Sequence, residues 1–532
     1  MESRRQSQYI ISTLAPKLMC SVLLTMTTHP NLPAFERGAL ASLPDQLAMW
    51  LAAQIHARTL SAGTRLPSVR EAAQRFGLSP STVVSAYDQL QAQGLIEARA
   101  QRGYFVREPG ARGASLPTSP VTRRAPPLDA AAMVRSMFEH RGDKAASPGI
   151  GTLPADWLDL PLLHTALRRA IADDGREHSS LRYGDPAGDV RLRTALTHRL
   201  ADLGIACDAA QIVTTAGATA ALDLVAQLLL APGDSVLVDE PGWPVEYARL
   251  ALMGVKCIPV PRAHDGPDRE AMRRILGSHH GADKPRAYVT VSVLHNPTGN
   301  SITLAAAHEV LKIAEAHDLT IVEDDSYAWL ASREAPRLCA LDQLQRTVYV
   351  CGFAKIITPA WRVGFLAAAP ALVERAIDRK LLTTLGAPGL AERALAIALE
   401  QGALRRHAER ITRRLAAART RTVRLAQEAG FSFATPPQGL FGWVDTGVDT
   451  DRLAAHLHGA GWLLTPGSLF HVTPRRSTLM RVNFAVAQDA RLWRVLREAR
   501  AQIAEPPRWD ARDNPSLPSP TAVGGPATRN HA

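Results

Sequence analysis

Residues 347–365, TVYVCGFAKIITPAWRVGF, join an apolar run to a lysine and an arginine that follow it closely. Comparable runs, rich in Val, Ile and Leu, occur earlier in the chain at 211–217, 234–242, 286–299 and 319–327. Helical stretches separate them, and nearly continuous apolar strands alternating with helices predict a mostly parallel sheet covered on both faces. We therefore expect a large α/β domain whose ligand site lies past the strand ends, at one edge of the sheet.

Polar motifs follow these runs. They read TTAGAT at 214–219, EPGWP at 240–244, HNPTG at 295–299 and EDDSY at 323–327, and a further motif, RVNFA, lies at 481–485. The first motif puts Gly217, Ala218 and Thr219 at the start of a helix. Free N–H groups and the helix dipole favour a phosphate at such a position.

Together these motifs resemble the fold type I pyridoxal-phosphate enzymes of the aminotransferase class, across residues 149–504. By this resemblance, Lys355 is the lysine that condenses with the aldehyde of pyridoxal 5'-phosphate, and Asp324 is the carboxylate that pairs with the pyridinium nitrogen. Arg481 would grip the carboxylate of an amino-acid ligand with two parallel hydrogen bonds. The remaining cofactor contacts implied in this way are Gly217, Ala218, Thr219, Trp243, Asn296, Tyr327, Arg362 and, reaching across a homodimer from the motif YGDPAGDVRLRTAL, Tyr183.

Two positions depart from that family. It usually carries hydroxyl residues one and three positions before the lysine, where they contact the phosphate, whereas this chain has Ala354 and Gly352. Each lost charge-assisted hydrogen bond is worth about 1.5 to 3 kcal/mol, so we expect the cofactor to be held less tightly. Because Lys355, Asp324 and Arg362 remain, we still expect the cofactor to bind.

A second pattern occupies the N-terminal part of the chain. Apolar side chains at 44–60 recur at helical spacing and predict one amphipathic helix. In LPSVREAAQRFG, at 66–77, Ser68 and Glu71 form a capping box and Gly77 supplies a left-handed stop. This stretch predicts a short second helix.

A third helix and a hairpin complete that pattern. LSPSTVVSAYDQLQAQG, at 78–94, has Ser79 as N-cap and Gly94 as terminator. Two short helices joined by a glycine-containing turn predict a helix-turn-helix. LIEARAQRGYFVRE, at 95–108, alternates like a β-hairpin with Gly103 near its turn, which predicts a wing.

Residues 36–107 resemble the GntR family of winged-helix regulators. The resemblance implies that the third helix reads bases in the major groove, that Arg70 contacts the DNA backbone and that Arg102 on the wing approaches the minor groove. The hydroxyls that would join the free N–H groups of the third helix in binding phosphate are those of Ser79, Ser81 and Thr82. The family commonly has an arginine where Pro80 stands, so one DNA contact is missing or moved.

The segment that joins the two parts, residues 108–148, is rich in Pro, Gly, Ser and Arg and predicts a flexible linker. The extension at 1–35 and the tail at 505–532 predict disordered ends. A winged helix linked to an aminotransferase-like domain resembles the MocR subfamily of GntR regulators. This resemblance implies a DNA operator, a homodimer, and a large domain that senses pyridoxal phosphate or an amino-acid or amine effector.

Two other functions fit the same residues. A working aminotransferase with an accessory DNA-binding domain is one, since every group needed for half of a transamination has a candidate. A regulator without cofactor is the other, if Gly352 and Ala354 mark a decayed site.

Composition limits the class of protein further. The chain has 61 Lys and Arg against 50 Asp and Glu, and the net charge of +11 favours an anionic partner. Its 5 cysteines include no CxxC pair and no His/Cys cluster, so neither a disulfide framework nor a metal site is indicated. No run of about twenty apolar residues occurs, and we expect a cytoplasmic protein.

Overall fold

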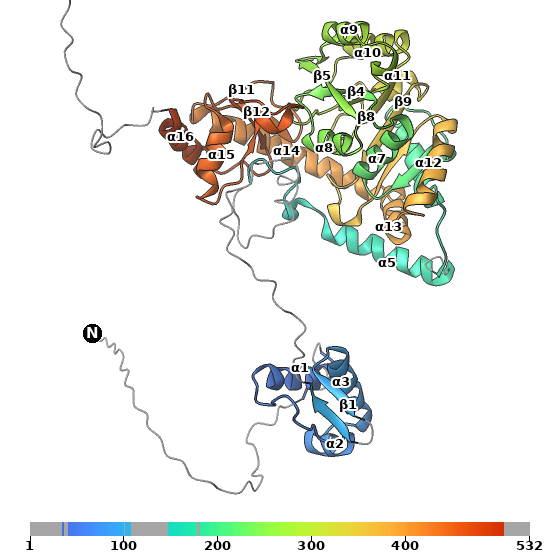
Figure 1. Ribbon diagram of the computed structural model, residues 1–532, viewed down its shortest axis with the longest axis vertical. Coiled ribbons are helices and arrows are strands. Elements are labelled where there is room, and N and C mark those ends of the chain that lie inside the picture. The colour runs from blue at the N-terminus through green and yellow to red at the C-terminus, as the bar shows by residue number, and fades with distance from the viewer. Residues whose placement is uncertain (1–34, 37–40, 100–101, 108–146, 178–180, 505–532) are drawn as a thin grey trace, which may run out of the picture. The chain divides into compact units, whose positions relative to one another are not determined.

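The computed structural model describes residues 35–36, 41–99, 102–107, 147–177 and 181–504. The chain divides between residues 124 and 125 into an N-terminal unit and a large unit. Figure 1 draws the first in blue and the second from teal to red. The predicted linker, N-terminal extension and C-terminal tail lie almost wholly outside the described residues and stay predictions.

The N-terminal unit consists of three helices followed by a two-stranded hairpin (Figure 1). Its elements are α1 (Leu43–His56), α2 (Val69–Phe76), α3 (Pro80–Ala92), β1 (Ile96–Arg99) and β2 (Gly103–Val106). Ser68 and Glu71 form the predicted capping box, and Gly77 ends α2 with a φ of 64°. β1 and β2 pair antiparallel, so the predicted winged helix-turn-helix is the fold of this unit.

The first helix is shorter than the sequence pattern predicted. α1 ends at His56 and not at residue 60. Beyond it Arg58 has a φ of 58°, and the N–H groups of Thr59 and Leu60 donate to the carbonyl of Gln54 at 3.0 and 3.1 Å. The turn brings Leu60 back against the core of the unit. Apolar spacing predicted the buried face correctly but could not show where the chain turns.

The large unit is built on an eight-stranded sheet with the order β3-β10-β9-β8-β7-β4-β5-β6. The strands are β3 (Ile212–Thr215), β4 (Ser235–Glu240), β5 (Lys256–Ala263), β6 (Gly266–Pro267), β7 (Ala287–Thr290), β8 (Thr320–Asp324), β9 (Thr347–Gly352) and β10 (Gly364–Ala367). Only the pairings of β10 and of β6 are antiparallel within it. All five apolar runs of the sequence therefore became strands of a mostly parallel sheet, as predicted.

Helices cover both faces of this sheet. In β9, Val348 and Val350 face a cluster that includes α7 and α12, whereas Tyr349 and Cys351 face a cluster that includes α6 and α14. This alternation places one strand between two apolar layers, which is why its sequence is apolar throughout. The helices of this part are α5 (Leu160–Glu177), α6 (Val190–Ala201), α7 (Ala218–Leu229), α8 (Pro244–Leu252), α9 (Arg269–Ser278), α10 (Leu304–Ala316), α11 (Leu338–Asp342), α12 (Pro370–Thr383) and α13 (Gly389–Glu400).

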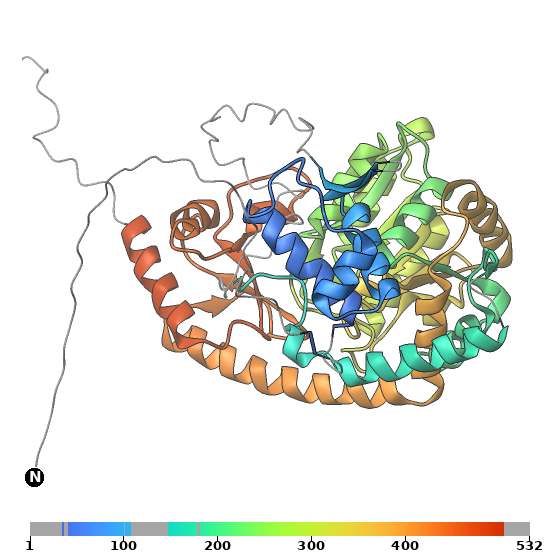
Figure 2. The ribbon, with the colours of Figure 1, turned by 90° about the horizontal axis from the view of Figure 1, so that it is seen from below.

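A smaller lobe follows, and the long helix α14 (Ala403–Glu428) joins it to the large sheet along the margin of the unit (Figure 2). Its antiparallel sheet has the order β11-β12-β14-β13. Its elements are β11 (Ser432–Phe433), β12 (Phe441–Asp445), α15 (Thr450–His458), β13 (Thr465–Pro466), β14 (Leu479–Asn483) and α16 (Ala490–Ala504). Short 3₁₀ helices of the large unit are η1 (Ala155–Trp157), η3 (Ala209–Gln211), η4 (Gly281–Asp283), η5 (Pro359–Trp361) and η6 (Gly467–Phe470).

Within the described ranges, no helix combines the length and the apolar character that crossing a membrane requires. The same residues contain no group of three or more His, Cys, Asp or Glu side chains arranged to hold a metal ion.

Candidate functional site

The predicted cofactor residues follow strands that run in one direction. Asp324 is the last residue of β8, and Lys355 follows β9. Asn296, Trp243 and Gly217 follow β7, β4 and β3. Because these strands point the same way, their carboxyl ends meet at one edge of the sheet, where ligands bind in such folds.

Lys355 lies at this edge and is half-buried. Its Nζ donates to the carbonyl of Gly151 at 2.7 Å. Burial lowers the pKa of Lys355 to about 8, with Arg481 acting in the same direction and Asp324 opposing it. A lysine with this pKa has a substantial fraction of neutral amine near pH 7, which is the form that attacks an aldehyde.

Arg481 reaches the same place from β14 of the smaller lobe. Its Nη1 donates to Asn296 Oδ1 at 2.8 Å, and its Nε and Nη2 donate to the carbonyl of Gly149 at 3.2 and 2.7 Å. The guanidinium carbon lies 4.6 and 5.1 Å from the ring centres of Phe441 and Phe470. Burial lowers the pKa of Arg481 to about 10, because the oxygens that accept from it carry no charge.

One glycine separates the two cations. A Cβ added to Gly151 would lie 3.8 Å from Lys355 Nζ and 3.8 Å from Arg481 Nη2. The amine of Lys355, to which a cofactor aldehyde could be attached, and the carboxylate-binding guanidinium of Arg481 thus lie within reach of one small molecule.

Asp324 is 8% exposed, and its Oδ1 accepts hydrogen bonds from the backbone N–H and the hydroxyl of Ser326 at 3.0 and 2.6 Å. Burial raises the pKa of Asp324 to about 6, against the hydrogen bond from Ser326, and the nearby carboxylate of Glu246 adds to the rise. Among the described residues no donor reaches Oδ2. A pyridinium N–H would supply that donor and favour the ionised carboxylate.

The start of α7 has the features of a phosphate site. Gly217, its N-cap, has a φ of 95° and no side-chain cap, and within the described part of the chain the N–H groups of Ala218 and Thr219 reach no acceptor. Arg362 Nη2 donates to the carbonyl of Ala216 at 2.9 Å. A Cβ at position 217 would lie 2.6 Å from that Nη2, and the φ of 95° disfavours any side chain there, so glycine suits this position.

A close contact with α7 explains why this chain has glycine at position 352, where the family usually has a hydroxyl residue. A Cβ added to Gly352 would meet the Cβ and the N of Ala218 at 3.1 Å. The missing side chain at position 352 therefore lets α7 lie close to β9. Free N–H groups, a guanidinium, an unpaired carboxylate oxygen and a buried amine fit the phosphate, ring nitrogen and aldehyde of pyridoxal phosphate.

Three further residues were predicted to contact the cofactor: Trp243, Tyr327 and Tyr183. Trp243 lines a cavity with Asp324 and His295. Tyr327 is buried and packs edge-on against Phe441, with ring centres 5.6 Å apart. Tyr183 has 89% of its surface exposed, and its contact across a dimer stays a prediction.

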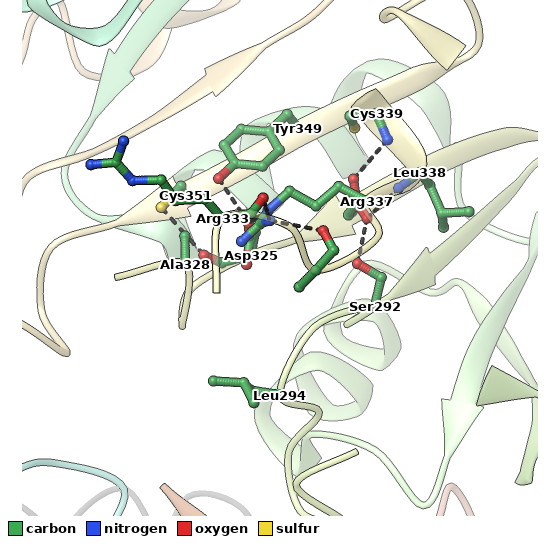
Figure 3. Close-up of polar contacts among 12 residues, drawn as sticks. Ser292, Leu294, Asp325, Ala328, Arg333, Arg337, Leu338, Cys339, Tyr349 and Cys351 are labelled. Carbon is green, nitrogen blue, oxygen red and sulfur yellow. Dashed lines mark hydrogen bonds and ion pairs between the residues drawn. The ribbon is translucent and has the colours of Figure 1, made fainter. Parts of the chain in front are cut away.

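A buried network beneath the site fixes the strand that carries Asp324. Asp325 Oδ2 accepts from Arg337 Nε at 2.6 Å and from the Tyr349 hydroxyl at 2.9 Å (Figure 3). Both charged side chains of this ion pair are completely buried. No sequence motif predicted this network. The sequence feature that points to the network is a run of three acidic residues, 323–325, at the end of an apolar strand.

The segment PGIGT, at 148–152, and the rings of Phe441 and Phe470 also belong to the site, although no motif predicted them. The two glycines of that segment supply the carbonyls that contact Lys355 and Arg481. Their close spacing was the available signal, although nothing in the local sequence indicated a contact across more than 200 residues.

In the N-terminal unit, the hydroxyls predicted to bind phosphate are joined to one another. Ser79 Oγ accepts from the Thr82 N–H at 3.1 Å and lies 2.9 Å from Ser81 Oγ. Arg70 and Arg102 are both exposed. Arg65, for which the sequence predicted no DNA contact, lies beside the wing. A Cβ added to Gly103 would be 3.6 Å from its Nε.

Comparison with known proteins identifies both units. Residues 149–498 match the aminotransferase class I and II family, and residues 43–106 match the bacterial regulatory proteins of the gntR family. The kynurenine aminotransferase of Pyrococcus horikoshii, a solved structure, aligns with 70% of this chain and 95% of its own, with a TM-score of 0.64 and 23% identity. At that identity the likeness shows the fold of the aligned part.

Two relatives match more than two thirds of the chain. The chain is 30% identical to the probable rhizopine catabolism regulatory protein MocR of Rhizobium meliloti, over 71% of this chain and 76% of that protein. It is 29% identical to the HTH-type transcriptional regulator YdcR of Escherichia coli, over 83% of this chain and 94% of that protein. The chain therefore belongs to the MocR-type transcriptional regulators of the GntR family, in which a helix-turn-helix that implies DNA binding is fused to an aminotransferase class I and II domain.

Proposed function

We propose that this regulator binds pyridoxal phosphate in its large unit and uses the bound cofactor to sense an amino acid or amine, which changes its hold on an operator. The observation that carries the proposal is the placing of Lys355 and Arg481 on either side of Gly151. In a chain with a gntR helix-turn-helix, the cofactor held at Lys355 would recognise the amine of an effector and Arg481 its carboxylate.

The roles of the residues follow from their geometry. When bound, pyridoxal phosphate supplies an aldehyde that exchanges amines. Lys355, with its lowered pKa, offers a neutral amine near neutral pH. Asp324 Oδ2 would hold the ring nitrogen, and the start of α7 with Arg362 would hold the phosphate.

Two copies of the chain would form the regulatory unit, with Tyr183 reaching the phosphate across the interface. Tyr183 and Leu181 are 89% and 80% exposed, which leaves both side chains available for a contact with a second copy. A ligand can shift such a dimer only as far as it binds one arrangement better than the other. A cytoplasmic location belongs to the same proposal.

The test is to sequence the genomic DNA fragments that the purified full chain retains, with and without pyridoxal phosphate. A common sequence among the fragments is expected, since two DNA-binding units set a fixed half-site spacing. Lys355→Ala should lose the absorbance band of the covalently bound cofactor and still retain these fragments. A band that survives in Lys355→Ala would contradict the lysine assignment.

A second candidate function, transamination, is favoured by one observation. The pKa of Lys355 is about 8, which suits a group that accepts and donates a proton during catalysis near neutral pH. Lys355 also lies close to the arginine that would bind a carboxylate. Sustained keto-acid production from a panel of amino acids would support an enzyme. A single stoichiometric change in absorbance would support the sensor. The third reading, a regulator without cofactor, requires that no absorbance band forms in excess pyridoxal phosphate.

A further inference from the structure

The helix α3 of the N-terminal unit has one buried side and one exposed side. The residues of its buried side are Val83, Ala86, Tyr87 and Leu90. Those of the opposite side, here called the outer face, are Ser81, Val84, Ser85 and Asp88, all of them exposed. They follow the i, i+3, i+4, i+7 spacing of a single helix face. Asp88 is the only charged residue of α3, which the structure describes in full, so the outer face carries no cation.

An apolar side chain stands in the middle of this outer face. Val84 is 39% exposed, and Pro80, which is also exposed, lies one helical turn before it. Both belong to the N-terminal half of α3. In helix-turn-helix proteins the N-terminal residues of the recognition helix are the ones that contact base edges. Val84 is therefore placed where a side chain can select a base.

The cations of the unit lie outside α3. Its described arginines, all exposed, are Arg58, Arg65, Arg70, Arg75, Arg99, Arg102 and Arg107. Their attraction to phosphates supplies affinity for DNA of any sequence, whereas sequence is read by contacts with base edges. In this chain the contacts that α3 makes with bases must come from uncharged groups or from Asp88.

These groups limit which base α3 can read. The commonest specific contact with guanine is made by arginine or lysine, through O6 and N7 of the base. The outer face has neither residue, and Pro80 stands where the family commonly has an arginine. A valine side chain forms no hydrogen bond, and the apolar group that a base pair presents in the major groove is the 5-methyl group of thymine. The hydroxyls of Ser81 and Ser85 can donate or accept, so they tolerate either base pair.

We propose that Val84 recognises the 5-methyl group of a thymine in each operator half-site, so that α3 selects an A·T base pair by apolar contact instead of a guanine by a guanidinium. The inference deepens the proposed function, because it rests on DNA binding by this unit and names the base that α3 reads. It requires no contribution from the cofactor or from the large unit.

The test uses the full chain and a duplex with the sequence common to the retained fragments. Thymines of one half-site are replaced one at a time by deoxyuridine, which removes only the 5-methyl group. At one position the affinity, measured by fluorescence anisotropy, should fall about fourfold, the worth of burying one such group. A half-site without thymine, or equal affinities for thymine and deoxyuridine at every position, overturns the inference while DNA binding itself stands. Failure to retain any common sequence overturns the proposed function and this inference with it.

A matched pair of variants assigns the effect to Val84. Val84→Ser removes the apolar group, and α3 should still form because serine and valine have similar helix propensities. This variant should bind the thymine and deoxyuridine duplexes with equal affinity. Met49→Ser changes another exposed apolar side chain of the same unit, on α1, and should keep the fourfold difference. A difference that survives in Val84→Ser, or that is lost equally in Met49→Ser, overturns the assignment.

Discussion

Arg481 on β14 donates from Nη1 to Asn296 Oδ1, after β7, over 2.8 Å. The bond joins the small antiparallel sheet to the edge of the large parallel sheet, and both side chains are buried, at 4% and 5% exposure. The predicted carboxylate-binding group is therefore held in position before any ligand arrives. Preorganisation of this kind reduces the entropy lost on binding.

Replacement of Arg481 by Lys should weaken the binding of maleate, a dicarboxylate without an amine, about tenfold to a hundredfold. Lysine keeps a positive charge but lacks the planar fork that binds a carboxylate through two hydrogen bonds. Titration calorimetry of the full chain measures the effect. Arg476→Lys is the control, because Arg476 has 95% of its side chain exposed. An affinity for maleate that is unaffected by Arg481→Lys would show that the carboxylate binds elsewhere.

Attachment of pyridoxal phosphate to Lys355 should become faster with rising pH and reach half of its maximum near pH 8. The pKa of Lys355 is lowered to about 8, and the neutral amine is the reactive form. Stopped-flow absorbance across pH 6 to 10 measures the rate. Arg481→Gln should move the midpoint upward, since Arg481 helps to lower this pKa. A midpoint near the usual value for lysine, about 10.4, would contradict the burial of this amine.

Replacement of Arg337 by Met should lower the free energy of unfolding by about 3 to 5 kcal/mol. It leaves the carboxylate of Asp325 buried without its cation. Denaturant unfolding monitored by circular dichroism measures the loss. The matched control is Arg346→Met, which removes an ion pair with the 95% exposed Asp318 and should change the stability little. Similar losses for both variants would show that the buried pair has no special role.

Replacement of Gly217 by Ala should weaken retention of pyridoxal phosphate about tenfold. The new Cβ would approach Arg362 Nη2 to 2.6 Å, and the φ of 95° disfavours any side chain. Equilibrium dialysis measures the dissociation constant. Gly277→Ala is the control, because a Cβ there meets nothing within 4 Å and its φ is not positive. Equal cofactor affinities in both variants would place the phosphate away from α7.

Replacement of Arg70 by Ala should weaken DNA binding across sequences and reduce the slope of log affinity against log salt by about 0.9. One phosphate contact releases about that number of counterions. Fluorescence anisotropy at several salt concentrations measures the slope. Arg286→Ala, an exposed arginine of the large unit, should leave it unchanged. A slope that stays the same in Arg70→Ala would remove Arg70 from the DNA interface.

The periodicity of the sequence predicted most of the fold. Strands such as β9 are buried on both faces, so they must be apolar throughout, and caps such as Ser68 and Gly77 act within a few residues of their own helices. These are local requirements that a single sequence displays. The end of α1 was not predictable, because the packing of Leu60 against the core of the unit decides where the helix stops.

The sequence by itself determined the two units, the order of the large sheet's strands along the chain and the residue types at the carboxyl edge of that sheet. Only the tertiary structure decided that the carbonyls of Gly149 and Gly151 meet Arg481 and Lys355. A backbone oxygen has the same chemistry in every residue, so no sequence pattern marks the one that fills a distant site. Its partner is selected by the packing of the whole chain.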